Sequence, residues 1–263
     1  MSLPTAAPPE EIAVSHCLLD ARGEVLDADA AERPYYAAST IKLHVLLAAL
    51  REAAAGRLDL SATVRATRTF TGSDGAPFTL GGDHLDPTHP AEGEPVAVRD
   101  LLRRMIDRSS NEATDQLLEL VGLDAVAAVV RELGLTATRV ERLIGDAAAL
   151  ERGLTNETSA AALARSMHHL VAGPGLSGDS RELALAALCA QTIPIIATVL
   201  RDGVRWGSKS GWVDGYRHDV AYVEDPAGAG RRILAVMTAG LTEDEADARI
   251  TALAAELLPG LTA

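Results

Sequence analysis

The sequence predicts an α+β fold, an α/β/α sandwich in which both ends of the chain contribute strands to one antiparallel sheet. Two segments with strand character, residues 12–19 and 24–27, come first. Three more, residues 204–211, 218–224 and 232–239, come near the end of the chain. Between the two groups, apolar side chains recur at helical spacing. We therefore expect a five-stranded antiparallel sheet with an all-helical subdomain inserted into it.

The boundaries of the other elements follow from periodicity and from residues that start or stop helices. Residues 41–50 are almost all apolar and Gly56 follows them, which predicts a helix buried on all sides. Further helices are expected at residues 96–106, 112–121, 123–133, 158–170, 181–189, 195–200 and 243–258. Extended stretches are expected at 63–67 and 136–143, loops at 72–95 and 144–156, and hairpin turns at 213–216 and 226–230. The expected subdomains are residues 1–45 with 195–263 for the sheet and residues 46–194 for the helices, packed as one unit.

Composition excludes several classes of partner. The 263 residues include 24 Lys and Arg against 37 Asp and Glu, a net charge of −13, so we expect neither nucleic acid nor an anionic membrane surface as a partner. No apolar run reaches the roughly 18 residues that a membrane-spanning helix needs. Residues 1–11 lack the cationic flank and apolar core of an export signal, so the chain is cytoplasmic as written, or periplasmic or extracellular if a signal was removed. We expect a monomer.

We expect no disulfide, metal or other cofactor. Cys17 and Cys189 lie far apart in apolar surroundings, which predicts two buried free thiols. Four potential metal ligands occur in the loop 72–95, namely Asp83, His84, Asp86 and His89. They lie on no expected helix or strand and lack the usual spacing of metal ligands, so a solvated loop is the better interpretation.

Ser39 and Lys42 stand at the start of the expected buried helix and are the first candidate catalytic residues. Three residues apart on a helix, their side chains share one face. Burial lowers the pKa of a lysine ammonium, and the neutral amine can take a proton from a neighbouring hydroxyl. Ser39 could then act as a nucleophile without a histidine. The alternative is that Ser39 only caps the helix and that the Lys42 ammonium reaches water past its apolar stem.

Two further motifs follow this one in order along the chain. The three are Ser39-Thr40-Ile41-Lys42, Ser109-Ser110-Asn111 and Lys209-Ser210-Gly211. Together they resemble the Ser-x-x-Lys, Ser-x-Asn and Lys-Thr/Ser-Gly motifs of class A β-lactamases and penicillin-binding proteins. The resemblance covers nearly the whole chain. It implies a serine hydrolase of the β-lactamase-like superfamily that needs no cofactor.

The resemblance implies a role for each matching residue in the first two motifs. It implies that Ser39 is the acyl-accepting nucleophile and that Lys42 is its base. Ser109 would relay a proton to the leaving nitrogen, and Asn111 would hold the side-chain amide of the substrate.

The third motif is implied to bind the other end of the substrate. Lys209 would keep the site electropositive and Ser210 would hydrogen-bond the substrate's carboxylate. The strand that contains Gly211 would pair with a peptide-like substrate, and the N–H group of Trp212, with that of Ser39, would stabilise the oxyanion. Arg217 is a second candidate for the carboxylate, or a charge that simply faces water. The implied substrate is a small molecule or peptide that carries an amide and a carboxylate.

One departure from the family concerns the release of the acyl group. In class A β-lactamases, a glutamate activates the water molecule that releases the acyl group. This glutamate belongs to a Glu-x-x-x-Asn motif that precedes the helix expected here to begin at residue 158. Residues 142–151 contain no such motif, and Glu151 and Glu157 are misplaced for the task. Asp146 is the possible replacement, although an aspartate there could equally bond only backbone N–H groups.

The missing glutamate favours an enzyme that is acylated by penicillins and releases them slowly, as penicillin-binding proteins and D-alanyl-D-alanine peptidases do. The alternatives are a functional β-lactamase with another base, a β-lactam-binding or sensing module without turnover, and an esterase. Two smaller departures are Ser110, where β-lactamases usually have aspartate, and the short stretch before the first strand. We expect Ser110 to change only the support of its neighbours, and the helix that opens this fold to be missing or truncated.

Overall fold

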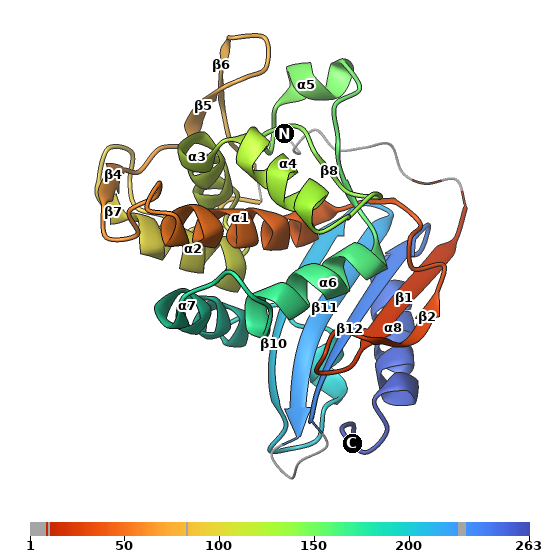
Figure 1. The fold of residues 1–263 in the computed structure, drawn as a ribbon. Coiled ribbons are helices and arrows are strands. Elements are labelled where there is room, and N and C mark those ends of the chain that lie inside the picture. Colours follow the sequence, from red (N-terminus) through yellow and green to blue (C-terminus); the bar gives the residue numbers. More distant parts are fainter. Residues whose placement is uncertain (1–8, 10, 83, 226–229) are drawn as a thin grey trace.

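The computed structural model describes residues 9, 11–82, 84–225 and 230–263, and its centre is one five-stranded sheet (Figure 1). Its strands are β1 (Ala13–Leu19), β2 (Val25–Asp29), β10 (Arg205–Val213), β11 (Tyr216–Asp225) and β12 (Gly230–Ala239). Their order is β10-β11-β12-β1-β2, and every neighbouring pair is antiparallel. The first strand therefore pairs with the last, with Ala13 opposite Ala239. The predicted sheet, built from both ends of the chain, is confirmed.

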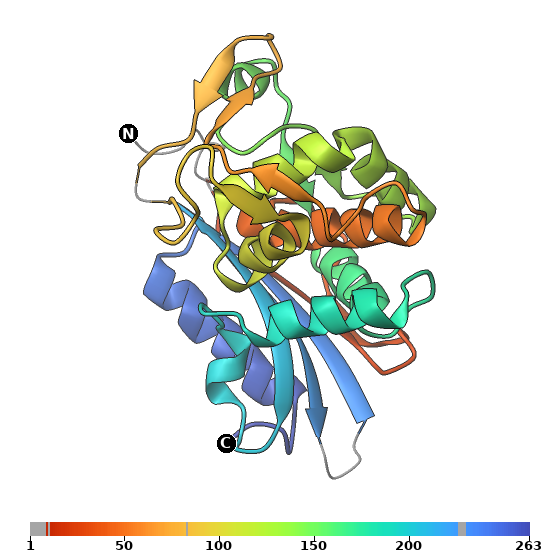
Figure 2. The ribbon, with the colours of Figure 1, turned by 90° about the vertical axis from the view of Figure 1, so that its left-hand side faces the viewer.

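Both faces of the sheet are covered by helices, because successive side chains along its strands point to opposite faces and are apolar on both. Leu18, Val223 and Leu234 belong to a core with α8 (Glu243–Leu257). Their neighbours Leu19 and Tyr222 belong to a larger core on the other face, where α6 (Ala160–Val171) packs. Figure 2 shows α8 and α6 on opposite sides of the strands. The α/β/α layering is confirmed.

Helix α1 (Lys42–Ala54) lies at the centre of the helical part. Every residue from Lys42 to Leu50 is buried, as a helix apolar on all sides requires. Around it pack α2 (Val98–Asp107), α3 (Asn111–Val121), α4 (Leu123–Glu132), α6 and α7 (Gly178–Cys189). The first turn of α1 is therefore held from several directions, and the candidate nucleophile Ser39 stands in the 3-10 turn directly before it.

Short elements complete the chain. They are the 3-10 turns Ala38–Ile41 and Ile196–Val199, helix α5 (Ala147–Glu151), and the strands β3 (Tyr35–Tyr36), β4 (Thr63–Arg65), β5 (Thr69–Thr71), β6 (Pro77–Thr79), β7 (Pro95–Ala97), β8 (Arg139–Val140) and β9 (Asn156–Thr158). Strands β3, β9 and β8 form a small sheet that joins the segment before Ser39 to the loop 144–156. Among the described residues, no helix combines the length and the apolar character needed to cross a membrane.

Four local expectations were wrong. The loop 72–95 is not without regular structure, because residues 77–79 form β6 and pair with β5. The loop 144–156 contains α5, whose five residues are too few for a helical period to be visible. Cys17 is buried as expected, but Cys189, the last residue of α7, is exposed. The helix expected at residues 195–200 is only the 3-10 turn Ile196–Val199 and not an α-helix. The hairpin turn expected at 226–230 falls mostly outside the described residues.

Candidate active site

Ser39 lies in the 3-10 turn Ala38–Ile41, which leads directly into α1. Ala38 at its start has φ 47°, a left-handed conformation that non-glycine residues adopt rarely and that is enriched at functional sites. The Ser39 side chain does not cap α1, so the interpretation of Ser39 as a helix cap is wrong. Its Oγ instead lies 3.1 Å from the Nζ of Lys42, within hydrogen-bond reach of a base.

Lys42 is fully buried, so its amine does not reach water and the alternative of an exposed ammonium is wrong. Its Nζ contacts four oxygens: the Oγ atoms of Ser39 and Ser109 at 3.1 Å each, the Oδ1 of Asn111 at 2.7 Å and the carbonyl of Ser109 at 2.6 Å. Burial, with a smaller contribution from the Lys209 charge, lowers the pKa of Lys42 well below its ordinary value. A neutral Lys42 amine can accept the Ser39 proton.

Ser109 connects the two buried lysines. It stands between α2 and α3 with φ 56°, and its Oγ lies 3.1 Å from the Nζ of Lys42 and 3.0 Å from the Nζ of Lys209. Lys209, on β10, is also fully buried, and its pKa is lowered to about 7, chiefly by burial and against the opposing effect of the Asp219 and Asp107 carboxylates. The structure thus brings all three sequence motifs together around one hydroxyl.

Gly211 lets β10 approach the turn that carries Ser39. A Cβ on residue 211 would lie 2.9 Å from the Ser39 nitrogen and 2.8 Å from the Thr40 nitrogen, closer than real contacts allow. The backbone after Gly211, where Trp212 follows, is therefore next to the Ser39 N–H. β10 is also an edge strand of the sheet, which leaves one side of it without a partner strand.

Arg217 is held by acidic side chains of α8. Its guanidinium makes a two-pronged ion pair with Asp247, at 2.7 and 2.8 Å, and a further ion pair with Glu243 at 2.9 Å. The alternative of a charge that simply faces water is wrong, because Arg217 is buried. Two carboxylates already neutralise Arg217, so a substrate carboxylate would have to share it with them. Ser210 on the neighbouring β10 also lines the cleft and is the better placed hydrogen-bond donor for that carboxylate.

The cleft at Ser39 has two compartments, which meet where His84 approaches Trp212 with ring centroids 5.8 Å apart. Both compartments are lined by Ser39, His84, Asn111 and Trp212. The Tyr36 compartment encloses about 540 Å³, part of it open to solvent, and its remaining lining is Tyr36, Ala38, Ile41, Arg142, Ile144, Gly145, Asn156 and Val213. The remaining lining of the Arg217 compartment is Leu85, Arg108, Ser109, Ile193, Ser210, Gly211, Arg217 and Glu243.

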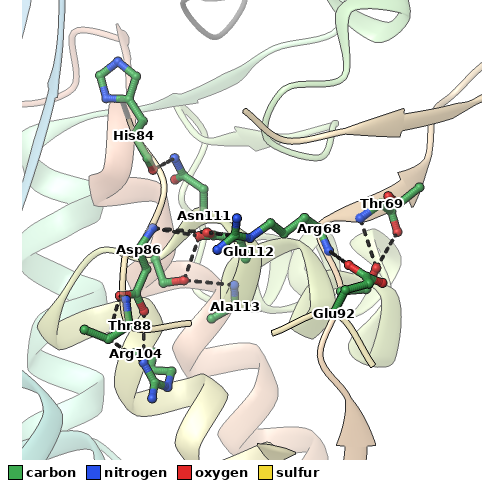
Figure 3. A network of polar contacts seen from close by, with 12 residues as sticks. Arg68, Thr69, His84, Asp86, Thr88, Glu92, Arg104, Asn111, Glu112 and Ala113 are labelled. Atoms are coloured by element: carbon green, nitrogen blue, oxygen red, sulfur yellow. Dashed lines mark hydrogen bonds and ion pairs between the residues drawn. The ribbon is translucent and has the colours of Figure 1, made fainter. Parts of the chain in front are cut away.

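The loop 84–89 is fixed to α3 by a polar network (Figure 3). The fully buried Glu112 accepts hydrogen bonds from the Asp86 N–H at 3.1 and 3.2 Å and from the Ser110 hydroxyl at 3.1 Å. The Asn111 amide donates to the His84 carbonyl at 3.0 Å, which places His84 over the cleft. Asp86 and His89 are buried, so the expectation of a solvated loop was wrong there. The described residues contain no group of three or more side chains suited to hold a metal ion, and Asp83 is not among them.

Comparison with known proteins identifies the family. The model of the beta-lactamase enzyme family matches residues 9–260. The chain belongs to this family. It is 31% identical over 188 residues to a curated beta-lactamase of Streptomyces albus G, an alignment that covers 67% of this chain and 60% of that protein. The chain therefore matches less than two thirds of that relative's length.

Solved structures of the family share the fold. A beta-lactamase from Sphaerobacter thermophilus superimposes with a TM-score of 0.77 and 28% identity, covering 94% of this chain and 91% of that one. An ancestral class A beta-lactamase has a TM-score of 0.77 and 24% identity, over 94% and 93% of the two chains. The resemblance drawn from the three motifs is confirmed, and with it membership of the β-lactamase-like superfamily.

Asp146 has the structural role that the sequence left open as an alternative. It is the N-cap of α5, where its Oδ1 accepts a hydrogen bond from the Ala149 N–H at 2.9 Å. Its Oδ2 accepts another from the Ser73 N–H at 2.8 Å. The carboxylate is thus occupied by backbone donors, and Asp146 is not among the residues that line either compartment.

Asp115 is a buried carboxyl group that sequence reasoning missed. It lies four residues after Asn111 on α3, so helical spacing could have placed it on the same face as this motif residue. Its Oδ1 accepts a hydrogen bond from the Ile144 N–H at 2.8 Å, while Oδ2 has no partner in the described part of the chain. Burial raises the pKa of Asp115 well above its ordinary value, against the smaller opposing effects of Lys42 and Arg142. Asp115 holds the segment that forms one wall of the Tyr36 compartment.

Proposed function

We propose that the chain is a serine-dependent acyl-transfer hydrolase that forms an acyl-enzyme on Ser39. The observation that carries this proposal is the position of the Lys42 amine, fully buried and within 3.1 Å of the Ser39 and Ser109 hydroxyls. A buried amine of lowered pKa is the base that a serine needs in the absence of histidine. We infer that the substrate carries an amide and a carboxylate, as the family resemblance implies.

In the proposed acylation, the Lys42 amine takes the Ser39 proton while Ser39 Oγ attacks the carbonyl carbon of the substrate. The N–H groups of Ser39 and Trp212 stabilise the oxyanion, and the close approach of Gly211 to the turn supports this arrangement. When the C–N bond breaks, the Ser109 hydroxyl donates its proton to the leaving nitrogen and recovers one from Lys42, which it contacts. The acyl group then remains on Ser39 until water attacks it.

We further propose that deacylation is slow, as in a penicillin-binding protein or D-alanyl-D-alanine peptidase. Among the described residues that line the Tyr36 compartment there is no aspartate or glutamate to activate a water molecule beside Ser39. Asp146 is occupied by the Ala149 and Ser73 N–H groups, which argues against its service as a base.

The second candidate is a β-lactamase with efficient turnover, which is favoured by the curated relative being named a beta-lactamase. Benzylpenicillin consumption, measured beside the fraction of acylated enzyme, separates the two. Slow deacylation predicts one penicillin consumed quickly per enzyme, with nearly all of the enzyme acylated, and little consumption afterwards. Rapid consumption with little acylated enzyme would refute it and support the β-lactamase. Absence of both would refute β-lactam acyl transfer.

A further inference from the structure

The Tyr36 compartment contains a buried positive charge that the acylation chemistry does not use. Arg142, on the segment after β8, is 2% exposed and lines this compartment together with Ser39 and Asn111. A guanidinium stays charged inside a protein, and an unpaired buried charge is costly. The Arg142 charge therefore needs to be neutralised, either by an acidic side chain of this protein or by an acidic group of a bound ligand.

No acidic partner is in contact with Arg142 in the described part of the chain. Its Nη2 donates to the Tyr36 hydroxyl at 2.8 Å and its Nη1 donates to the Leu143 carbonyl at 3.2 Å. Two of its five N–H groups are thus used, and Nε has no partner in the described residues. Asp115 is a nearby carboxyl group, but it bonds the Ile144 N–H and forms no ion pair with Arg142.

The surroundings of Arg142 hold it in place before any ligand binds. The Asn156 side chain accepts hydrogen bonds from the Glu141 and Arg142 N–H groups at 3.0 and 3.4 Å, and donates one to the Arg142 carbonyl at 3.1 Å. The Tyr36 hydroxyl accepts from Arg142, and its own hydrogen has no acceptor in the described residues. Arg142 and Tyr36 thus form a fixed pair of donors with no acidic side chain in the lining.

We propose that the Tyr36 compartment binds a carboxylate on the acyl side chain of the substrate, with Arg142 and Tyr36 as its donors. This inference rests on the proposed function in one respect, namely that Asn111 binds the side-chain amide of the substrate. The part of the acyl side chain that lies beyond this amide then enters the Tyr36 compartment. The carboxylate of the leaving side lies in the other compartment, at Ser210. The preferred substrate is therefore an amide with a negative charge at each end.

Two penicillins that differ by one carboxylate test this directly. Carbenicillin is benzylpenicillin with a carboxylate on the side-chain carbon next to the amide carbonyl. The measured quantity is the ratio of their second-order rates of acylation of the protein, followed by intact mass. Charge-assisted hydrogen bonds from Arg142 predict a ratio of roughly tenfold to a hundredfold in favour of carbenicillin. A ratio at or below one would overturn the proposal.

Substitutions assign the preference to its donors. Arg142→Met should bring the ratio to about one or lower, because the charge is removed from the compartment. Tyr36→Phe should reduce the ratio severalfold, and it tests the proposal should the Arg142 variant not fold. Arg139→Met is the matched control: Arg139 is half-exposed and paired with Glu157, so its loss should leave the ratio unchanged. A folded Arg142→Met variant with the original ratio would also overturn the proposal.

Non-covalent binding separates failure of this inference from failure of the proposed function. In Ser39→Ala, which cannot be acylated at residue 39, the ratio of the two dissociation constants measures the same preference. If the native protein forms no adduct but Ser39→Ala still prefers carbenicillin, acyl transfer fails and the carboxylate site stands. If adducts form without a preference in rate or binding, the carboxylate site fails and acyl transfer stands.

Discussion

Replacement of Gly211 by alanine tests whether β10 and the Ser39 turn must be this close. The new Cβ would lie 2.8 Å from the Thr40 nitrogen and 2.9 Å from the Ser39 nitrogen, whereas ordinary contact begins at 3.4 Å. The strand and the turn would have to separate by 3.4 − 2.9, about 0.5 Å, to relieve the contact with Ser39. A misplacement of about 1 Å at a reacting centre can cost about 100-fold, so we expect acylation to slow about tenfold or more.

The same substitution four residues earlier on β10 is the matched control. A Cβ on Gly207 would lie 2.6 Å from a Tyr222 ring carbon and 2.9 Å from Leu188 Cβ, so Gly207→Ala overpacks the core without touching the Ser39 turn. Each variant should lose about 1–3 kcal/mol of unfolding free energy. Acylation by benzylpenicillin is followed by quenched intact mass and stability by urea unfolding. The reasoning is refuted if Gly211→Ala acylates at the native rate, or if Gly207→Ala slows acylation equally.

Three further predictions concern charged and titrating groups. Burial lowers the pKa values of His44 and His218 to about 4, so between pH 6.5 and 4 these histidines are protonated in the unfolded chain but neutral in the folded chain. The free energy of unfolding should therefore fall by about 3 kcal/mol per histidine as the pH drops through that range. Urea midpoints that stay level from pH 7 to 4.5 would contradict this. Because the pKa of Lys209 is about 7, the rate of acylation by an anionic β-lactam should decline as the pH rises through 7 and the Lys209 charge is lost. Lys209→Arg stays charged over this range, so the variant should not show the decline. A decline with the same midpoint in the variant would contradict the assignment. Asp146→Asn should leave the lifetime of the penicillin adduct within about twofold of native, since Asp146 serves as a helix cap; a markedly longer lifetime would identify it as the base.

The sequence was informative where structure depends on local patterns. Alternating apolar residues predicted the five strands within a few residues, and the almost entirely apolar run 41–50 predicted that α1 is buried on all sides. The three motifs predicted which side chains would meet at Ser39, because each is short and its spacing is set by one local element. The distances between the three motifs could not be predicted from the sequence, because they are set by the tertiary fold.

The remaining features of the site arise from contacts between distant segments. His84 contacts Trp212, and Arg142 contacts Tyr36, although each pair is separated by more than a hundred residues in the sequence. No local spacing in the sequence predicts such pairs. Glu112 is an acidic residue in the first turn of α3, a position that is often exposed, yet it is fully buried and accepts a hydrogen bond from the Asp86 N–H of loop 84–89. Whether a polar side chain is solvated or enclosed is decided by tertiary packing, which composition and periodicity do not report.

The central claim is that Lys42 activates Ser39 for acylation, and the mass of the intact protein after brief exposure to benzylpenicillin tests it most directly. The native chain should gain one acyl group, and Ser39→Ala should gain none. Lys42→Met, which keeps an unbranched side chain one atom shorter but removes the base, should be acylated roughly 100-fold to 10,000-fold more slowly. An unmodified native protein, an acylated Ser39→Ala, or a Lys42→Met that reacts at the native rate would contradict the account.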